Sequence, residues 1–290
     1  MRPAVPLVRS YLYVPGNDRK KIEKALASSA DAVVLDLEDA VAPNRKEEAR
    51  EIVAEVLRSE PEKPIFVRTN VPGSALADED VEAVAGPGLA GLRLPKSESA
   101  EKVRRVAQRL EALGCEAGIQ CLIESALGLE LAFEISRAHE RVVGLGLGEA
   151  DLKADLGIRG EGEAGLLYAR SRVVSAARAA GLPGPVQSVY TNVRDTDGLR
   201  NSTQAGRDMG FVGRSAIHPA QVAVINEVFT PTEREISEAN ELLDRLDSEA
   251  ASGAGAFALE DGRFVDRAVV ESARVILALA RRASERAGAP

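Results

Sequence analysis

Short apolar runs alternate with amphipathic stretches along most of the chain. Eight runs are strand-like, several of them apolar throughout as strands buried on both faces are, and apolar residues recur at helical spacing between them. Most runs start roughly 20 to 35 residues apart, the length of one βα unit. This pattern predicts an α/β protein with a closed (β/α)8 TIM barrel, and a doubly wound open sheet is the alternative. We expect strands at residues 10–14, 32–38, 64–70, 91–95, 118–124, 142–148, 185–190 and 211–217.

The pattern also divides the chain into two parts. Residues 1–230 are predicted to form the barrel, and residues 231–290 a C-terminal helical extension. In the extension, helices at 232–248 and near 266–284 flank a stretch of Gly, Ala and Ser at 251–256, which is typical of a hinge. We therefore expect the extension to pack on a neighbouring subunit or to act as a lid.

Composition and charge narrow the class of partner. The 290 residues are 45% hydrophobic and 28% charged, with a net charge of −8 and no Lys- or Arg-rich tract, which argues against nucleic acid. The two cysteines, Cys115 and Cys121, make no disulfide framework, so a cytoplasmic location is expected. The sequence contains no apolar run of about 18 residues and no signal-peptide pattern, so we expect no membrane span.

Carboxylates follow three of the predicted strands, in the segments LDLED, LIES and GLGEAD. The carboxyl ends of barrel strands form the active-site face. Glu124 and Asp151 would follow two adjacent strands, and adjacent strands lie about 5 Å apart, so both carboxylates can reach one ion. Two carboxylates, with the other positions taken by water and substrate, usually hold Mg²⁺, and Mn²⁺ suits the same ligands. The alternative is that each residue only caps a helix, since acidic residues favour helix N-termini.

A second acidic group lies at the end of the strand predicted at 32–38. Alternation places Asp36 and Glu38 on one face, with Asp39 beside them, and like charges this close require cations or a metal nearby. The alternative is that these acids are exposed cap residues. Arg68, at the end of the strand predicted at 64–70, has the fork geometry that grips a carboxylate. It could bind the acid group of a substrate, pair with these strand-end acids, or do both. We take Arg68, Glu38 and Asp39 as candidate catalytic residues.

With these residues identified, the chain resembles the citrate lyase beta-subunit-like branch of the HpcH/HpaI aldolase superfamily. The resemblance runs nearly end to end, and its motifs appear in the family's order. The longest is VVLDLEDAVAPNRKEEAR at 33–50; the others are RSYLYVPGN, VRTN, RLPKSE, LIESALG, GLGEADLKADLG and GRSAIHPAQV. The resemblance implies a (β/α)8 barrel, usually trimeric, so a homotrimer or higher homo-oligomer is expected.

The resemblance also implies roles for particular residues. Glu124 and Asp151 match the Mg²⁺ ligands, and Arg68 matches the arginine that holds the keto-acid portion. Arg19 and Lys24 match basic residues near the coenzyme A.

An Asp in the family's C-terminal segment reaches a neighbouring subunit's site as acid/base, and the segment FVDRAVVESA places it at Asp266. Three positions depart from the family pattern. Ala268 stands where Pro is frequent, Gln187 where Asp is frequent, and Arg214 where Lys is common.

The activity that the resemblance implies is a Claisen-type carbon–carbon lyase. The substrate would be a carboxylated 3-hydroxyacyl-CoA of the citryl-, malyl- or citramalyl-CoA type, and the products acetyl-CoA and an oxo acid. Three alternatives stay open: a citrate lyase beta chain that acts on an acyl-carrier thioester within a complex, a malyl-CoA thioesterase, and a non-catalytic protein that binds CoA thioesters.

Overall fold

The computed structural model describes residues 8–160, 163–250, 257–258, 264–265 and 267–287. The chain divides into two compact units, Met1–Glu227 and Val228–Pro290.

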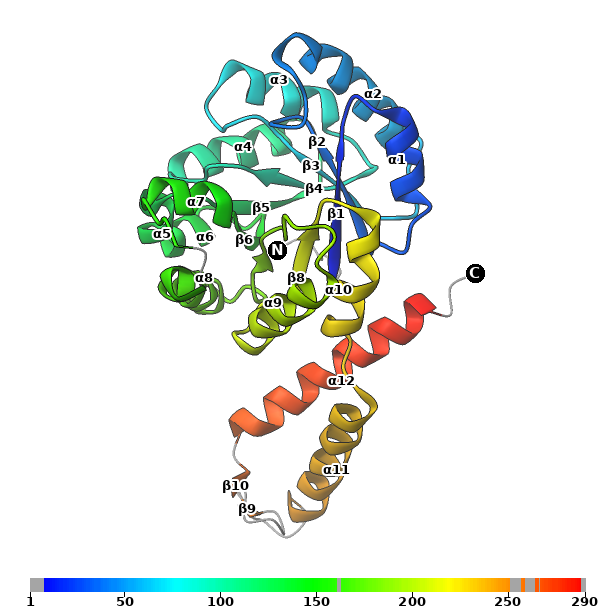
Figure 1. Cartoon of the computed structure of the whole chain (residues 1–290), viewed down its shortest axis with the longest axis vertical. Helices are drawn as coiled ribbons and strands as arrows, with labels where there is room; N and C mark the ends of the chain where they lie inside the picture. The colour runs from blue at the N-terminus through cyan, green and yellow to red at the C-terminus, as the bar shows by residue number, and fades with distance from the viewer. Residues whose placement is uncertain (1–7, 161–162, 251–256, 259–263, 266, 288–290) are drawn as a thin grey trace. The chain divides into compact units, whose positions relative to one another are not determined.

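The first unit is a closed barrel of eight parallel strands in sequence order (Figure 1). Strand β8 pairs with β1 and so closes the sheet, which confirms the predicted barrel over the open sheet. Every predicted run overlaps a strand. The strands are β1 (Ser10–Pro15), β2 (Ala32–Asp36), β3 (Ile65–Arg68), β4 (Leu89–Leu94), β5 (Gly118–Ile123), β6 (Val142–Leu147), β7 (Val186–Gln187) and β8 (Gly213–Ala216).

Helices surround the barrel (Figure 1). They are α1 (Arg19–Leu26), α2 (Lys46–Arg58), α3 (Ala75–Val84), α4 (Ala100–Ala112), α5 (Ala126–Glu130), α6 (Ala132–Ser136), α7 (Glu149–Asp155), α8 (Leu167–Ala179), α9 (Thr196–Asp208) and α10 (Val222–Phe229). Short 3-10 turns, η1 (Pro43–Arg45), η2 (Glu163–Leu166) and η3 (Pro219–Gln221), precede α2, α8 and α10.

Helix α4 illustrates how the sequence determines where these helices begin and end and which face they bury. The Ser99 side chain accepts a hydrogen bond from the Lys102 backbone N–H, the usual N-cap arrangement. Gly114, two residues past the helix end, has φ +66°, a conformation that favours glycine. The helix buries one apolar stripe, formed by Val103, Val106, Ala107 and Leu110.

The barrel interior changes from apolar to charged along the strand direction. An apolar cluster of Val8, Tyr11, Ala32, Val34, Phe66 and Val186 fills the N-terminal part. Further along, Asp36, Arg68, Arg93 and Gln120 are neighbours in register across β2 to β5. Residues paired in this way point to the same face of a sheet. The barrel therefore presents charged side chains toward its C-terminal end.

The second unit contains the helices α11 (Glu233–Ala250) and α12 (Arg267–Ala287), which pack against each other. Two short antiparallel strands, β9 (Phe257–Ala258) and β10 (Phe264–Val265), lie between them in sequence. The stretch 251–256, expected to be a hinge, lies outside the described residues. Within the described part of the chain, no helix is long and apolar enough to cross a membrane.

Candidate active site

The predicted site residues of the barrel come from the C-terminal ends of four strands. Asp36 and Arg68 are the last residues of β2 and β3, and Glu124 directly follows β5. Glu38 lies two residues beyond β2, and Asp151 is the third residue of α7, which follows β6. Since all eight strands are parallel, these side chains gather at one end of the barrel.

Arg68 pairs with the acids of β2. Its Nε and Nη2 donate to the two Oδ atoms of Asp36 at 2.7 and 2.6 Å, as a fork. Its Nη1 lies 2.9 Å from Glu38 Oε2 and 3.5 Å from an Oδ atom of Asp39. Burial lowers the pKa of Arg68, but the hydrogen bonds and charge of Asp36 outweigh it and hold that pKa above its usual range. Of the two roles considered for Arg68, the pairing with strand-end acids is therefore present, and the contact with substrate stays a prediction.

Glu38 is a buried carboxylate with an unusual proton affinity. Its pKa is raised to about 7, first by burial and then by the charges of Asp39 and Glu124, although Arg68 and Lys96 oppose the shift. Its Oε2 lies close to Arg68 but makes no hydrogen bond within the described residues. Asp39, by contrast, is exposed. Glu38 can thus exchange a proton near neutral pH.

Glu124 and Asp151 form the carboxylate pair expected to hold a metal. Glu124 is buried, and its Oε2 accepts a 2.9 Å hydrogen bond from the backbone N–H of Lys96. Burial raises the pKa of Glu124, and the nearby charge of the exposed Asp151 raises it further. Two carboxylates that repel each other are stabilised by a shared cation.

This donor set fits Mg²⁺ or Mn²⁺. Hydrogen bonds from the described residues occupy Oε2 of Glu124 but not its Oε1. Among the described residues, no three side chains of His, Cys, Asp or Glu lie close enough to hold a metal together. An ion here would therefore use two protein carboxylates and fill its other positions with water and substrate, which is the usual arrangement for Mg²⁺.

Three glycines of β6 and its end leave room for these charged side chains. Gly144, Gly146 and Gly148 alternate and so face the barrel interior. A Cβ on Gly146 would lie 3.0 Å from Nη2 of Arg93, and one on Gly148 would lie 2.5 Å from Oε1 of Glu124. The alternation is visible in the sequence VVGLGLGE, but the sequence alone does not indicate that it leaves space for side chains of a neighbouring strand.

Sequence reasoning also missed a stack of arginines and tyrosines in the barrel. Arg93 is 1% exposed, and its Cζ lies 4.9 Å from the Tyr11 ring centre and 5.3 Å from that of Tyr13. Arg68 Cζ lies 5.2 Å from the same Tyr13 ring. Arg93 Nη1 also donates to Ser215 Oγ at 3.3 Å. Arg93 and Arg68 thus both make a cation–π contact with the Tyr13 ring.

A neighbouring helix holds the start of α7 in place. Arg170 of α8, which is 3% exposed, donates from Nε and Nη2 to the two carboxylate oxygens of Glu149 at 2.7 and 3.0 Å. Arg170 also pairs with Glu163. The Ser188 hydroxyl accepts from the Glu149 backbone N–H, at the point where β7 ends earlier than expected. These contacts fix the helix turn that carries Asp151.

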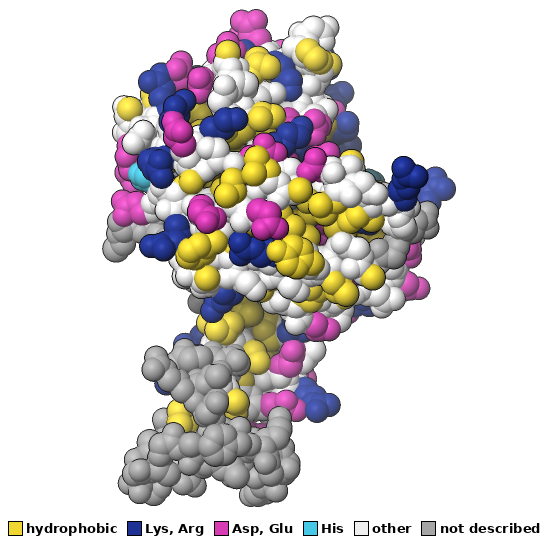
Figure 2. All heavy atoms as spheres, turned by 90° about the vertical axis from the view of Figure 1, so that its left-hand side faces the viewer, with side chains coloured by type: hydrophobic (Ala, Val, Ile, Leu, Met, Phe, Trp, Pro, Cys, Tyr) yellow, Lys and Arg dark blue, Asp and Glu magenta, His cyan; other side chains and the backbone are white. Residues whose placement is uncertain are grey.

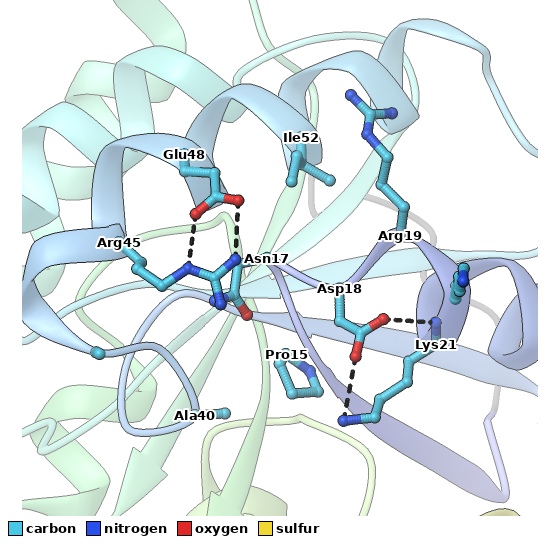
Figure 3. A pocket seen from close by; sticks show the side chains of 11 residues that line it. Pro15, Asn17, Asp18, Arg19, Lys21, Ala40, Arg45, Glu48 and Ile52 are labelled. Atoms are coloured by element: carbon cyan, nitrogen blue, oxygen red, sulfur yellow. Dashed lines mark hydrogen bonds and ion pairs between the residues drawn. The ribbon is translucent and has the colours of Figure 1, made fainter.

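A hollow lies beside the same end of the barrel, at the start of α1 (Figure 3). It has a volume of about 660 Å³, and Arg19 lines it, as do Lys20, Lys21 and Arg45. Lys21 pairs with Asp18, and Arg45 pairs with Glu48. Lys24, in the last turn of α1, is exposed and is not part of this lining.

Two of the departures from the family pattern contact helix α9. Gln187 Nε2 donates to Ser202 O at 2.8 Å, and Arg214 Nη1 donates to Thr203 Oγ1 at 3.0 Å. Burial lowers the pKa of Arg214 to about 10. Asp266 lies outside the described residues.

Residues 9–219 match the family model for HpcH/HpaI aldolase/citrate lyase. The chain is 37% identical over 275 residues to the (3S)-malyl-CoA thioesterase of Cereibacter sphaeroides, which covers 94% of this chain and 94% of the relative. It is 35% identical over 291 residues to the mitochondrial citramalyl-CoA lyase of Homo sapiens, covering 94% of this chain and 85% of the relative.

A solved structure is similar over almost the whole chain. It is the CitE protein of Mycobacterium tuberculosis in complex with magnesium, acetoacetate and coenzyme A, with a TM-score of 0.78 and 30% identity. The match covers 96% of this chain and 100% of that one.

Proposed function

The chain belongs to the HpcH/HpaI aldolase/citrate lyase family, and from this premise we propose that it is a Mg²⁺-dependent carbon–carbon lyase. It cleaves a carboxylated 3-hydroxyacyl-CoA to acetyl-CoA and an oxo acid. The observation that carries the proposal is the convergence of three features at one end of the barrel: the buried Glu124, the exposed Asp151 and the Asp36–Arg68 pair. That combination suits a divalent cation beside an anionic substrate.

Glu124 and Asp151 would hold the metal, through carboxylate oxygens that Mg²⁺ and Mn²⁺ both accept. A bound divalent ion supplies Lewis-acid chemistry and orients a substrate's oxygen atoms. The CitE complex with magnesium, acetoacetate and coenzyme A supports the same assignment here.

Arg68 binds the acid end of the substrate in this proposal. Its Nε and Nη2 are held by Asp36, which fixes the guanidinium plane, and Nη1 faces Glu38. A substrate carboxylate or developing carbonyl oxygen can share Nη1. A fixed donor of this kind stabilises developing negative charge with little reorganisation.

Glu38 is our candidate for the base that takes the substrate's hydroxyl proton, with Asp39 next to it. A general base works best with a pKa near the working pH, and the pKa of Glu38 is raised to about 7. As the O–H bond breaks, its electrons form the carbonyl of the oxo acid, and the adjacent carbon–carbon bond breaks. The electrons of that bond pass to the acetyl thioester as an enolate. Asp266 then protonates the enolate carbon to give acetyl-CoA.

The hollow at α1 is the proposed place of the coenzyme A. Arg19, Lys20, Lys21 and Arg45 bring four cations to its lining, against Asp18 and Glu48. Phosphate groups are bound by such basic side chains. We propose that Arg19 contacts the coenzyme directly and that Lys24 adds positive charge nearby.

A homo-oligomer, with a trimer as the expected state, completes the proposal. Large apolar side chains are exposed on α5, α7 and α8: Leu127, Leu156, Leu167 and Tyr168. Figure 2 shows hydrophobic side chains gathered on this face of the molecule. Apolar surface of this kind is typical of an interface between proteins. We propose that the C-terminal segment delivers Asp266 to a neighbouring subunit, and that the enzyme works in the cytoplasm.

The decisive assay incubates the purified protein with citryl-, malyl- and citramalyl-CoA, and with the corresponding acyl-carrier thioesters, with and without Mg²⁺. It measures oxo acid, acetyl thioester and free thiol. We expect Mg²⁺-dependent oxo acid and acetyl-CoA in equal amounts from at least one substrate. Free thiol without oxo acid would instead indicate the thioesterase alternative. Activity confined to acyl-carrier thioesters would indicate the citrate lyase beta chain, and neither product from any thioester would contradict catalysis.

A further inference from the structure

Lys96 occupies a strained backbone position directly after β4, at the charged end of the barrel. Its φ is +45°, in the left-handed region that residues other than glycine rarely adopt. Among the described residues, only Glu60 shares this feature, with φ 46°. Strain of this kind persists only where surrounding contacts hold it, and it concentrates at functional sites.

The contacts that hold Lys96 join the two buried carboxylates of the site. Its backbone N–H donates to Glu124 Oε2 at 2.9 Å, and its Nζ donates to Glu38 Oε1 at 3.3 Å. Because φ is the rotation about the N–Cα bond, it sets the direction of the side chain relative to the N–H. At +45°, the N–H reaches the acid after β5 while the ammonium reaches the acid after β2.

The consequence for Glu124 is a fixed carboxylate plane. The Lys96 N–H occupies Oε2, and Gly148 lies against Cγ and Oε1 without a side chain of its own. Oε1 accepts no hydrogen bond from the described residues. One oxygen is therefore anchored and the other is presented to a ligand.

We infer that Lys96 is a positioning residue, whose ammonium, anchored on Glu38, keeps its backbone left-handed and so aims Glu124 Oε1 at the metal. The inference rests on the proposed function, because it assumes that Glu124 binds the divalent ion. The change in metal affinity that it predicts is opposite in sign to that of a simple charge effect. Removal of a nearby cation would by itself tighten the binding of a metal ion, whereas loss of the anchor weakens it.

The test is Mn²⁺ affinity without substrate, measured by titration calorimetry and by the electron paramagnetic resonance of free Mn²⁺. Lys96→Met keeps the aliphatic stem but loses the ammonium, so the backbone relaxes to negative φ and the N–H leaves Glu124. We expect Kd to rise about tenfold or more, the usual size for loss of an outer-shell partner. Lys96→Gly and Lys96→Asn also lose the ammonium, but both residues tolerate positive φ. They should stay within about threefold of the wild type, as should Lys96→Arg.

Glu60→Gly is the matched control, because it relieves the same backbone strain at an exposed turn after α2. Its Kd for Mn²⁺ should equal that of the wild type. Equal affinity in Lys96→Met, Lys96→Gly and the wild type would overturn the inference, as would tighter binding in both variants, which a pure charge effect predicts. Failure of the wild type to bind Mn²⁺ at all would instead overturn the proposed function and the inference with it.

Discussion

Gly148 and Glu124 are packed so closely that no side chain fits between them. A Cβ on Gly148 would lie 2.5 Å from both Cγ and Oε1 of Glu124. The space that glycine leaves is thus occupied by the carboxylate proposed to bind the metal, so the backbone after β6 and the acid after β5 constrain each other.

Gly148→Ala should therefore displace Glu124 and weaken metal binding. We expect Kd for Mn²⁺ to rise about tenfold or more, and the free energy of unfolding to fall by about 1–3 kcal/mol through overpacking. Calorimetry and urea denaturation measure the two effects. Gly86→Ala is the control, since a Cβ there would meet nothing within 4 Å. Unchanged Mn²⁺ affinity in Gly148→Ala would contradict the assignment of Glu124.

Arg68→Lys should impair catalysis without affecting the coenzyme. Lysine keeps the charge but cannot reproduce the fork that joins Arg68 to Asp36, so kcat/KM for carboxylated CoA thioesters should fall about a hundredfold. The Kd for free CoA should stay nearly unchanged. Arg50→Lys is a matched control, because Arg50 pairs with the buried Asp80 on helix α3, outside the site. An equal loss of CoA affinity in Arg68→Lys would place Arg68 at the wrong end of the substrate.

Glu38 should make the metal-free protein less stable as the pH rises. Its pKa is raised by burial from 4.5 to about 7, so the native state holds a proton that the unfolded chain releases. The resulting stabilisation is complete below pH 4.5 and is lost as the pH rises through about 7. It amounts to about 3 kcal/mol. Urea denaturation of chelator-treated protein should therefore show a decline with pH that Glu38→Gln lacks, and parallel profiles would refute the shift.

Asp266 and Glu124 should complement each other across subunits. Asp266→Ala and Glu124→Ala proteins are each expected to be inactive. When they are unfolded together and reassembled, a mixed oligomer contains sites with an intact Glu124 and a neighbour's intact Asp266, so partial activity should return. Native mass spectrometry verifies the mixing. Mixed oligomers without activity would mean that Asp266 serves its own subunit or has no catalytic role.

The barrel was predictable because its signal is local. A strand buried on both faces must be apolar, so each strand could be located from its own residues, and parallel order brought Glu124 and Asp151 to one end. Which charged side chains pair with each other was not predictable in the same way. The pairing of Arg68 with Asp36 depends on lateral distances between β2 and β3, which periodicity does not encode.

Two charged residues at or near the site were missed for different physical reasons. Arg93 lies inside an apolar run, and nothing local indicates that Gly146 of another strand leaves space for it. The role proposed for Lys96 depends on a positive φ, which lysine disfavours, so the residue type alone predicts a negative φ there.

The stack in which Tyr13 contacts both Arg68 and Arg93 gives this protein a natural optical probe. The sequence has no tryptophan and only four tyrosines, so its near-ultraviolet circular dichroism comes chiefly from the tyrosine rings. Two of the four, Tyr11 and Tyr13, lie in this stack. A ligand that draws on the charge of Arg68 changes the electrostatic field at the Tyr13 ring. Binding of a substrate's acid group at Arg68 can therefore be followed by near-ultraviolet circular dichroism in the unlabelled protein. In most enzymes tryptophan signals obscure this part of the spectrum.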